Sequence, residues 1–273
     1  MGKLGVIAAI AFLVAVLSYF LIPLLWMIFA AFDPNAGPEL KIPTNPSLVN
    51  FEKLAEPIGA AVPYTWILNS LIIASASATL ATVLALLAAY VMTRHSFRGQ
   101  EALTTMFVSF RLIPVIVIAL PIMVLYKGWG LNNTLQGVIL AHTALILPFA
   151  ILILDGYLRG IPTTYEEAAM IDGCSKLGAF LRITLPLALP GLVTVWLISF
   201  VFSWGEYVIP RLIIATETLT PAAVGLDYFK GLHGQIDYGR IAAFSILYTL
   251  PVVAIFMYIK KYLQRGVAGL VSR

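Results

Sequence analysis

The residues best suited to chemistry form a small acidic cluster in one polar loop of the chain. Glu166, Glu167 and Asp172 lie in the loop formed by residues 158–183, next to the small residues Ala168 and Ala169. An anionic membrane surface attracts Lys and Arg rather than carboxylates, whereas small side chains let the backbone of another protein approach closely. The cluster therefore favours docking of a protein partner, and an amphipathic helix resting on lipid headgroups is the alternative.

The same loop carries the pattern of a short helix, a glycine break and a second helix. Thr164 followed by Glu167 fits a capping box, in which two side chains bond each other's backbone N–H groups. Gly173 can adopt the left-handed conformation that ends many helices. A further helical turn is expected through Leu177 and Phe180. The loop is therefore predicted to form a compact knob between two longer helices.

Signals for catalysis are absent from the sequence. It contains no phosphate-binding glycine loop with Lys and Ser or Thr, no zinc-ligand spacing and no nucleophile elbow. His142 has no second metal ligand at a suitable spacing, so a packed histidine is expected there. The single cysteine, Cys174, cannot form an intrachain disulfide. The sequence thus predicts a protein that is not itself an enzyme.

The composition indicates what must position this loop. The chain has 273 residues, of which 60% are hydrophobic and 11% charged, whereas a soluble domain is about 45–50% apolar and about 25% charged. So few charges cannot cover a globular surface with solvated groups. The sequence therefore predicts an integral membrane protein, and the net charge of +4 is interpreted through membrane orientation and not through nucleic-acid binding.

Six apolar segments are long enough to cross a bilayer, which takes about 20 residues of helix. The predicted spans are residues 4–32, 66–93, 104–126, 133–154, 184–205 and 241–259, and only the third contains a charge, Arg111. The first is about twice as long as the 7–15-residue apolar core of a cleaved signal peptide, so it is expected to be retained. A short helix is predicted around residues 47–55, between the first two spans.

The basic residues orient these spans, because Lys and Arg are enriched on the cytoplasmic side. With the N-terminus inside, the outer segments hold Lys41, Lys53, Lys127, Arg211, Lys230 and Arg240. The inner segments then hold the larger group of Lys3, Arg94, Arg98, Arg159, Lys176, Arg182, Lys260, Lys261, Arg265 and Arg273. The prediction is that both termini, and the loop of residues 158–183, lie in the cytoplasm.

Polar residues in or beside the spans are candidates to line a pathway through the membrane. Arg111 either faces the bundle interior, because arginine is costly against lipid, or snorkels to the surface from near a helix end. Glu206 and Tyr207, with Arg211, either line a cavity at the exit of the fifth span or mark the membrane boundary with an ion pair. Asn69 fits either hydrogen bonding to a substrate or helix capping.

The spacing within the loop matches a known signature. Glu167-Ala168-Ala169 is followed after three residues by Gly173, and after nine more by Ile183-Thr184-Leu185-Pro186. This E-A-A-x3-G-x9-I-x-L-P pattern resembles that of the permease subunits of binding-protein-dependent ABC importers. Other stretches, among them Leu147-Pro148-Phe149 and Trp204-Gly205-Glu206-Tyr207, are similar to the carbohydrate subgroup and to the smaller permease of the maltose type.

The resemblance implies a fold and a location. It implies the type I ABC importer permease fold, an all-α membrane protein with six transmembrane helices, N-in and C-in, in one domain of residues 1–273. A cytoplasmic coupling helix would lie between spans four and five. The protein would be a multi-pass component of a prokaryotic plasma (inner) membrane. The residues implied to dock on an ATPase are Glu166, Glu167, Ala168, Ala169, Ile171, Asp172 and Gly173.

The resemblance also implies partners and cargo. The expected partners are a second permease in a heterodimer, two cytoplasmic ATPase subunits and an extracytoplasmic solute-binding protein, all working in a lipid bilayer. ATP and magnesium would be bound by the ATPase, and no cofactor by this chain. The implied substrate is a sugar, oligosaccharide or polyol. The C-terminal residues 269–273 depart from the usual ending of the subgroup, so a contact of the tail with the ATPases stays open.

Two other functions remain as alternatives. An ion-driven secondary transporter predicts ionisable residues deep inside its spans to carry the coupling, whereas spans one, two, four, five and six here have charge-free cores. A membrane-assembly subunit without transport activity has no need of an intact docking loop. Both features favour the ATP-driven importer.

Overall fold

The computed structural model describes residues 3–230 and 236–271, and this part of the chain is helical with only two isolated β-bridges. Five helices are long and apolar enough to cross a membrane, or six if a bent helix pair counts as one span, all within the described residues. The long helices are α1 (Lys3–Phe32), α3 (Pro63–Arg94), α6 (Leu135–Arg159), α9 (Leu185–Gly205) and α12 (Tyr238–Val271). The predicted all-α class is confirmed. Arg273, counted above on the inner side, lies outside the described residues.

Shorter elements connect these helices. They are α2 (Val49–Glu52), α4 (Gln100–Phe110), α5 (Val115–Trp129), α7 (Thr164–Ile171), α8 (Lys176–Ala179), α10 (Val208–Ile213) and α11 (Ala222–Gly225), with 3-10 turns at Lys53–Ala55, Glu217–Leu219 and Leu226–Phe229 and a π-helical segment at Phe180–Thr184. The short helix predicted around residues 47–55 is thus present as α2 and the turn after it.

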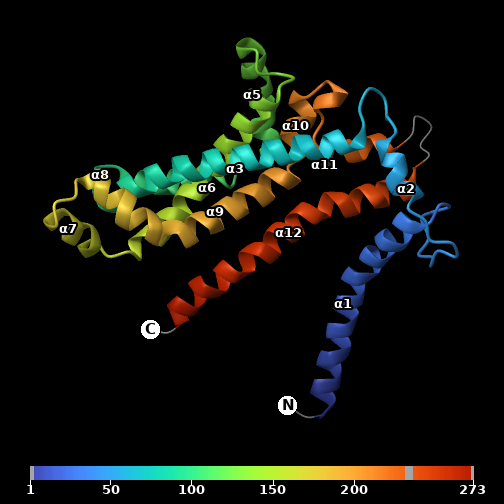
Figure 1. Cartoon of the computed structure of the whole chain (residues 1–273), viewed down its shortest axis with the longest axis horizontal. Helices are drawn as coiled ribbons and strands as arrows, with labels where there is room; N and C mark the ends of the chain where they lie inside the picture. The colour runs from blue at the N-terminus through green and yellow to red at the C-terminus, as the bar shows by residue number, and fades with distance from the viewer. Residues whose placement is uncertain (1–2, 231–235, 272–273) are drawn as a thin grey trace.

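The centre of the fold is α3, which lies along both α6 and α9 (Figure 1). One face of α3 is a row of alanines spaced three or four residues apart, which puts them on one side of a helix. Small side chains let helix backbones approach closely in a membrane protein. The fully buried members of this row are Ala74, Ala78, Ala81, Ala85 and Ala89. The alanine row is therefore what packs α3 against two helices at once.

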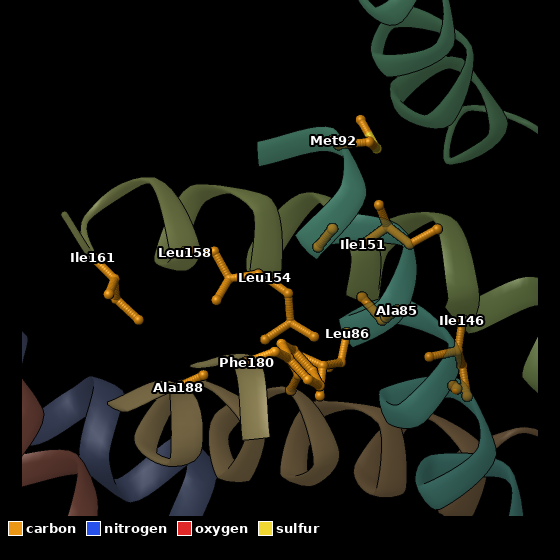
Figure 2. Close-up of a cluster of buried hydrophobic side chains, with 14 residues drawn as sticks. Ala85, Leu86, Met92, Ile146, Ile151, Leu154, Leu158, Ile161, Phe180 and Ala188 are labelled. Atoms are coloured by element: carbon orange, nitrogen blue, oxygen red, sulfur yellow. The ribbon is translucent and has the colours of Figure 1, made fainter. Parts of the chain in front are cut away.

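Larger side chains fill the remaining space between these three helices at the end nearest α7. Figure 2 shows Leu154 and Leu158 of α6 directed toward Phe180 and Ala188, with Leu86 of α3 beside them. Leu154 and Leu158 are completely buried. This core anchors both helices that enter and leave the loop predicted to dock a partner.

A second core joins α1 and α12 at the opposite end. Trp66 is completely buried there and its ring contacts the rings of Tyr228, Phe229 and Phe244. From this end α1 and α12 diverge (Figure 1). Beyond the second core, the large apolar side chains of α1 are exposed, and Phe12 is 72% exposed. An apolar helix without neighbours in its own chain is suited to lipid or to a helix of another chain.

The third predicted span, residues 104–126, is not one straight helix. The chain forms α4 and α5, which are bent by 99° at the short break between them. Pro114 explains the break, because proline lacks an N–H and disfavours helical geometry in the residue before it. The guanidinium of Arg111 lies in the break, 3.7 Å from the centre of the Phe149 ring on α6. The third predicted span is therefore a broken pair of helices and not a single one.

Candidate functional site

The loop predicted to dock a partner lies at one end of the helix bundle, where α7 and α8 protrude between α6 and α9 (Figure 1). The backbone N–H groups of Gly173 and Cys174 donate to Met170 O at 3.1 Å and to Ala169 O at 3.0 Å. Gly173 has a φ of +93°, so α7 ends in a Schellman motif. The prediction that Gly173 ends the helix is confirmed.

The beginning of α7 differs from the prediction. The N-cap residue is Thr163 and not Thr164, and it makes no side-chain capping bond. The N–H groups of Glu166 and Glu167 instead donate to the backbone carbonyl of Thr163. The predicted capping box of Thr164 and Glu167 is therefore wrong, because Thr164 is already the first helical residue of α7 and no side chain caps this end.

One face of α7 is open to contact. Ile171 is 87% exposed, although a large aliphatic side chain is normally buried. The residues exposed beside it are Glu167, Ala168, Asp172 and Gly173. In this set Glu167 and Asp172 are acidic, Ile171 is apolar, and Ala168 and Gly173 have little or no side chain. It forms a surface on which another protein can lie close to the helix backbone.

Two of the seven residues implied to dock face the other way. Glu166 and Ala169 are buried against the bundle, with 7% and 9% of their surface exposed. Their inclusion in a docking surface is wrong for this conformation, because a helix of 3.6 residues per turn puts them opposite Ala168 and Ile171. Glu166 has internal partners instead.

The Glu166 carboxylate accepts hydrogen bonds from three side chains. Arg94 Nε donates to Oε1 at 2.8 Å, Tyr90 OH to Oε2 at 2.9 Å and Thr184 Oγ1 to Oε1 at 2.6 Å. Burial by itself raises the pKa of Glu166, but the bonds from Thr184, Tyr90 and Arg94 outweigh it and lower the pKa below its ordinary value. The carboxylate is therefore charged at neutral pH and fully partnered.

The candidate pathway residues are also placed by the structure. Asn69 is 9% exposed and its Nδ2 donates to the carbonyls of Thr218 and Thr220 at 2.9 and 3.0 Å. Its side chain is therefore engaged with carbonyls at the end of the 3-10 turn Glu217–Leu219. Tyr207 is 39% exposed and its hydroxyl donates to Asp227. That bond raises the pKa of the Tyr207 hydroxyl.

Glu206 does not pair with Arg211 in the described residues. Its carboxylate is buried, accepts the N–H groups of Val208 and Ile209 at 2.8 and 2.9 Å, and lies 3.1 Å from His142 Nε2. The predicted ion pair is wrong because the carboxylate folds back onto the first turn of α10. The expectation that His142 is packed in the fold is confirmed, since only 1% of it is exposed.

An apolar groove of about 710 Å³ runs between α3, α9 and α12. Trp196 lies in it and begins a stack of aromatic rings that continues through Phe200 and Trp204 to Tyr248. The residues lining the groove are Thr82, Leu189, Leu192, Val193, Trp196, Ala254, Ile255 and Tyr258. Such a groove is suited to a lipid chain or to a further transmembrane helix.

Comparison with known families settles the class of protein. The family described as "Binding-protein-dependent transport system inner membrane component" matches residues 81–269, which run from within α3 into the last part of α12 and include the whole loop of residues 158–183. The chain belongs to this family. It is thus an inner-membrane component of a binding-protein-dependent transport system, and the resemblance found in the sequence is confirmed.

Individual relatives of this inner-membrane component are matched over nearly their whole length. The trehalose/maltose transport system permease protein MalG of Thermococcus litoralis is 30% identical, covering 95% of this chain and 93% of that protein. The trehalose transport system permease protein SugB of Mycobacterium tuberculosis is 31% identical, covering 94% and 93%. The diacetylchitobiose uptake system permease protein DasC of Streptomyces coelicolor is 28% identical, covering 92% and 90%.

Solved structures share the fold of this inner-membrane component. A chain of a bacterial ABC transporter involved in the import of the acidic polysaccharide alginate matches with a TM-score of 0.80 at 17% identity, covering 95% of this chain and 96% of that one. A chain of a bacterial alginate transporter in complex with its pentasaccharide-bound periplasmic protein matches with a TM-score of 0.65 at 18% identity, covering 94% of each. These likenesses show an ABC importer permease fold.

Sequence reasoning missed the internal partners of the loop. Arg94 was assigned only to membrane orientation, and Tyr90 and Thr184 were not singled out. Arg94 and Glu166 are 72 residues apart, and no periodicity links residues at that distance. The sequence did place a basic residue, Arg94, at the inner end of the second span, on the same side as the acidic loop of residues 158–183. That arrangement indicates an attraction between the two segments but does not identify which residues pair.

Proposed function

We propose that this inner-membrane component is a permease subunit that forms part of the pathway of an ATP-driven importer and couples it to ATPase subunits. The observation that carries the proposal is α7, a short helix with a Schellman end, whose exposed face presents Glu167, Ala168, Ile171 and Gly173 at the end of the bundle. A capped helix fixed between two long helices can transmit a displacement to both. Membership of a binding-protein-dependent family supports this role.

The proposed partners follow from that role. The exposed face of α7 docks on one of two cytoplasmic ATPase subunits, which bind ATP and magnesium. A second permease completes the pathway as a heterodimer, and an extracytoplasmic binding protein delivers the substrate. The chain itself binds no cofactor and hydrolyses no ATP. The excess of Lys and Arg on the side predicted to be cytoplasmic, where the loop of residues 158–183 would also lie, supports this arrangement.

The proposed substrate is a sugar or oligosaccharide. The support comes from relatives matched over nine-tenths of their length, which are named for trehalose, maltose and diacetylchitobiose transport. Reconstitution of the assembled complex in proteoliposomes, with ATP inside and each labelled sugar supplied with the binding protein, measures the preference. Polyols belong in the same panel, because their hydroxyl groups offer the same hydrogen-bonding chemistry.

The docking role is tested by changing the exposed face of α7. Glu167→Lys and Gly173→Arg place bulky basic groups on this surface, and both variants should lose co-purification with the ATPases and ATP-dependent uptake. Glu101→Lys is the matched control, because Glu101 is also an exposed carboxylate, on α4, and this variant should keep both. Survival of association and uptake in the α7 variants contradicts the docking role.

The same assay decides between this function and ion-driven transport. A proton uncoupler added while internal ATP stays high should leave uptake unchanged. Loss of uptake under those conditions would establish a secondary transporter instead. Assembly with both kinds of partner but no uptake of any sugar or polyol would favour the membrane-assembly subunit.

A further inference from the structure

The face of α7 opposite the docking surface is tied to α3. Arg94 and Tyr90 lie one turn apart in the last turns of α3, and both donate hydrogen bonds to the Glu166 carboxylate. The Arg94 and Glu166 side chains are 7% and 10% exposed. A carboxylate removed from water is held only where donors replace its hydration. α7 is therefore joined to α3 by a buried, charge-assisted contact.

Arg94 also holds the stretch of chain that leads into α7. Its Nη2 donates to the carbonyl of Ile161 at 3.1 Å, while its Nε donates to Glu166. A guanidinium presents several N–H groups in a fixed plane, so two bonds from one Arg fix the relative position of their acceptors. The entrance of the loop and the first turn of α7 therefore move as one piece with the end of α3.

The third donor ties α7 to the beginning of α9. Thr184 is completely buried and its hydroxyl donates to Glu166 at 2.6 Å. Thr184 is the last residue of the π-helical segment that precedes α9. The first residue of that segment, Phe180, packs edge-to-face on Tyr90 with ring centres 4.6 Å apart. π-helical turns interrupt regular helices and recur at functional sites, and this one lies where α9 meets the carboxylate.

We propose that Glu166 is a positioning residue: its carboxylate pins α7 to the ends of α3 and α9, so that a displacement of α7 moves both helices together. The inference rests on the proposed function, because it assumes that an ATPase moves α7. It separates two tasks on one short helix. Glu167, Ala168 and Ile171 face outward for docking, while Glu166 transmits the movement inward. A fully satisfied polar network is rigid enough for that task.

The test uses the complete complex with its ATPases and binding protein in proteoliposomes. Glu166→Gln keeps the size of the side chain and removes its charge. Co-purification of the ATPases should be unchanged, whereas the number of ATP molecules hydrolysed per sugar imported should rise roughly fivefold or more, the low end of coupling between distant sites. Arg94→Met should give the same change, and the double variant should be no worse than either single one, because all three remove one connection.

The matched control is Asp155→Asn. Asp155 is another largely buried carboxylate at the same end of the bundle, and its donors among the described residues are Thr93 of α3 and Arg159, the last residue of α6, with none from α7 itself. Its ratio of ATP to sugar should stay at the wild-type value. An equal rise in the control overturns the proposal, because it would show general loosening of the bundle. Loss of ATPase association in Glu166→Gln also overturns it, since Glu166 would then act in docking.

A milder variant covers the case in which Glu166→Gln does not fold. Thr184→Val removes one donor without changing charge or shape, and it should raise the ratio of ATP to sugar by a smaller factor with association intact. A wild-type ratio in Thr184→Val and Arg94→Met overturns the inference while leaving the proposed function in place. Failure of the proposed function is recognised separately, by Glu167→Lys retaining both association and uptake.

Discussion

His142 Nε2 lies 3.1 Å from Glu206 Oε2, and this contact joins the first part of α6 to the residue that follows α9. The other ring nitrogen of His142 lies 2.7 Å from the Ser203 hydroxyl. All three side chains are buried. Since the same carboxylate also receives the first N–H groups of α10, one residue holds three elements in register.

The first prediction concerns this carboxylate. Glu206→Leu leaves two amides and the imidazole without their acceptor, and a buried donor without a partner costs about 1–3 kcal/mol. We expect the free energy of unfolding to fall by at least about 2 kcal/mol, measured by thermal unfolding in detergent. Tyr207→Phe is the neighbouring control, because it removes one exposed bond and should change stability by less than about 0.5 kcal/mol. Equal losses would contradict this role for Glu206.

The second prediction concerns the close approach of α11 to Trp66. A Cβ at Gly225 would lie closer to the Trp66 ring than real Cβ contacts allow, and the completely buried ring has no room to move. Gly225→Ala should therefore cost about 1–3 kcal/mol through overpacking. Gly205→Ala, at a position with open space, should be close to neutral in the same unfolding assay. A neutral Gly225→Ala would show that this core can expand.

The third prediction concerns the left-handed residue that ends α7. Gly173 has a φ of +93° and open space around it, so backbone strain alone decides which residues it accepts. Gly173→Asn should retain more ATPase association than Gly173→Val, because Asn tolerates this region and a β-branched residue does not. Gly156→Ala, inside α6 with open space, should leave association unchanged. The order of co-purified ATPase among the three variants checks this, and an equal yield from Asn and Val would contradict it.

The fourth prediction is a pH dependence. The pKa of Glu166 is lowered in the folded protein, so its contribution to stability is complete above the ordinary value near 4.5 and is lost as the pH falls through the lower folded value. The difference in melting temperature between wild type and Glu166→Gln should be largest at neutral pH and shrink below about pH 4.5. Thermal scans in detergent between about pH 7 and pH 3 measure it. Glu101→Gln should show no such difference, and a constant difference for Glu166→Gln would contradict the charged network.

The sequence indicated the helices well where one residue pattern determines the structure. Gly173 was correctly placed at the end of a helix because only a residue without a Cβ adopts a φ of +93° without strain. The alanine row of α3 and the length of its apolar span can likewise be recognised from neighbouring residues alone, by their helical spacing and their composition. Pro114 disfavours helical geometry in the residue before it, but no break was predicted in this span, and the bend of 99° depends on how α4 and α5 pack.

The candidate site was predicted in its location and only partly in its geometry. The motif from Glu167 to Pro186 identified the family, and the helix appeared between the expected spans. Which of the two neighbouring glutamates faces outward was not predicted. That choice depends on Arg94, Tyr90 and Thr184, which come from two other segments of the chain. A carboxylate at Glu166 is stable in the interior only because those donors meet there.

By itself, then, the sequence determined that the chain belongs in a membrane, that it is helical, and that residues 158–183 carry the family motif in a loop with a short helix. These properties follow from composition, helical period and local backbone preferences, each of which acts over a few neighbouring residues. The tertiary structure decided the contacts across helices: Glu166 with Arg94, Glu206 with His142, and Asn69 with the backbone at Thr218. Such pairs form because packing removes polar groups from their surroundings and leaves only distant parts of the chain to satisfy them.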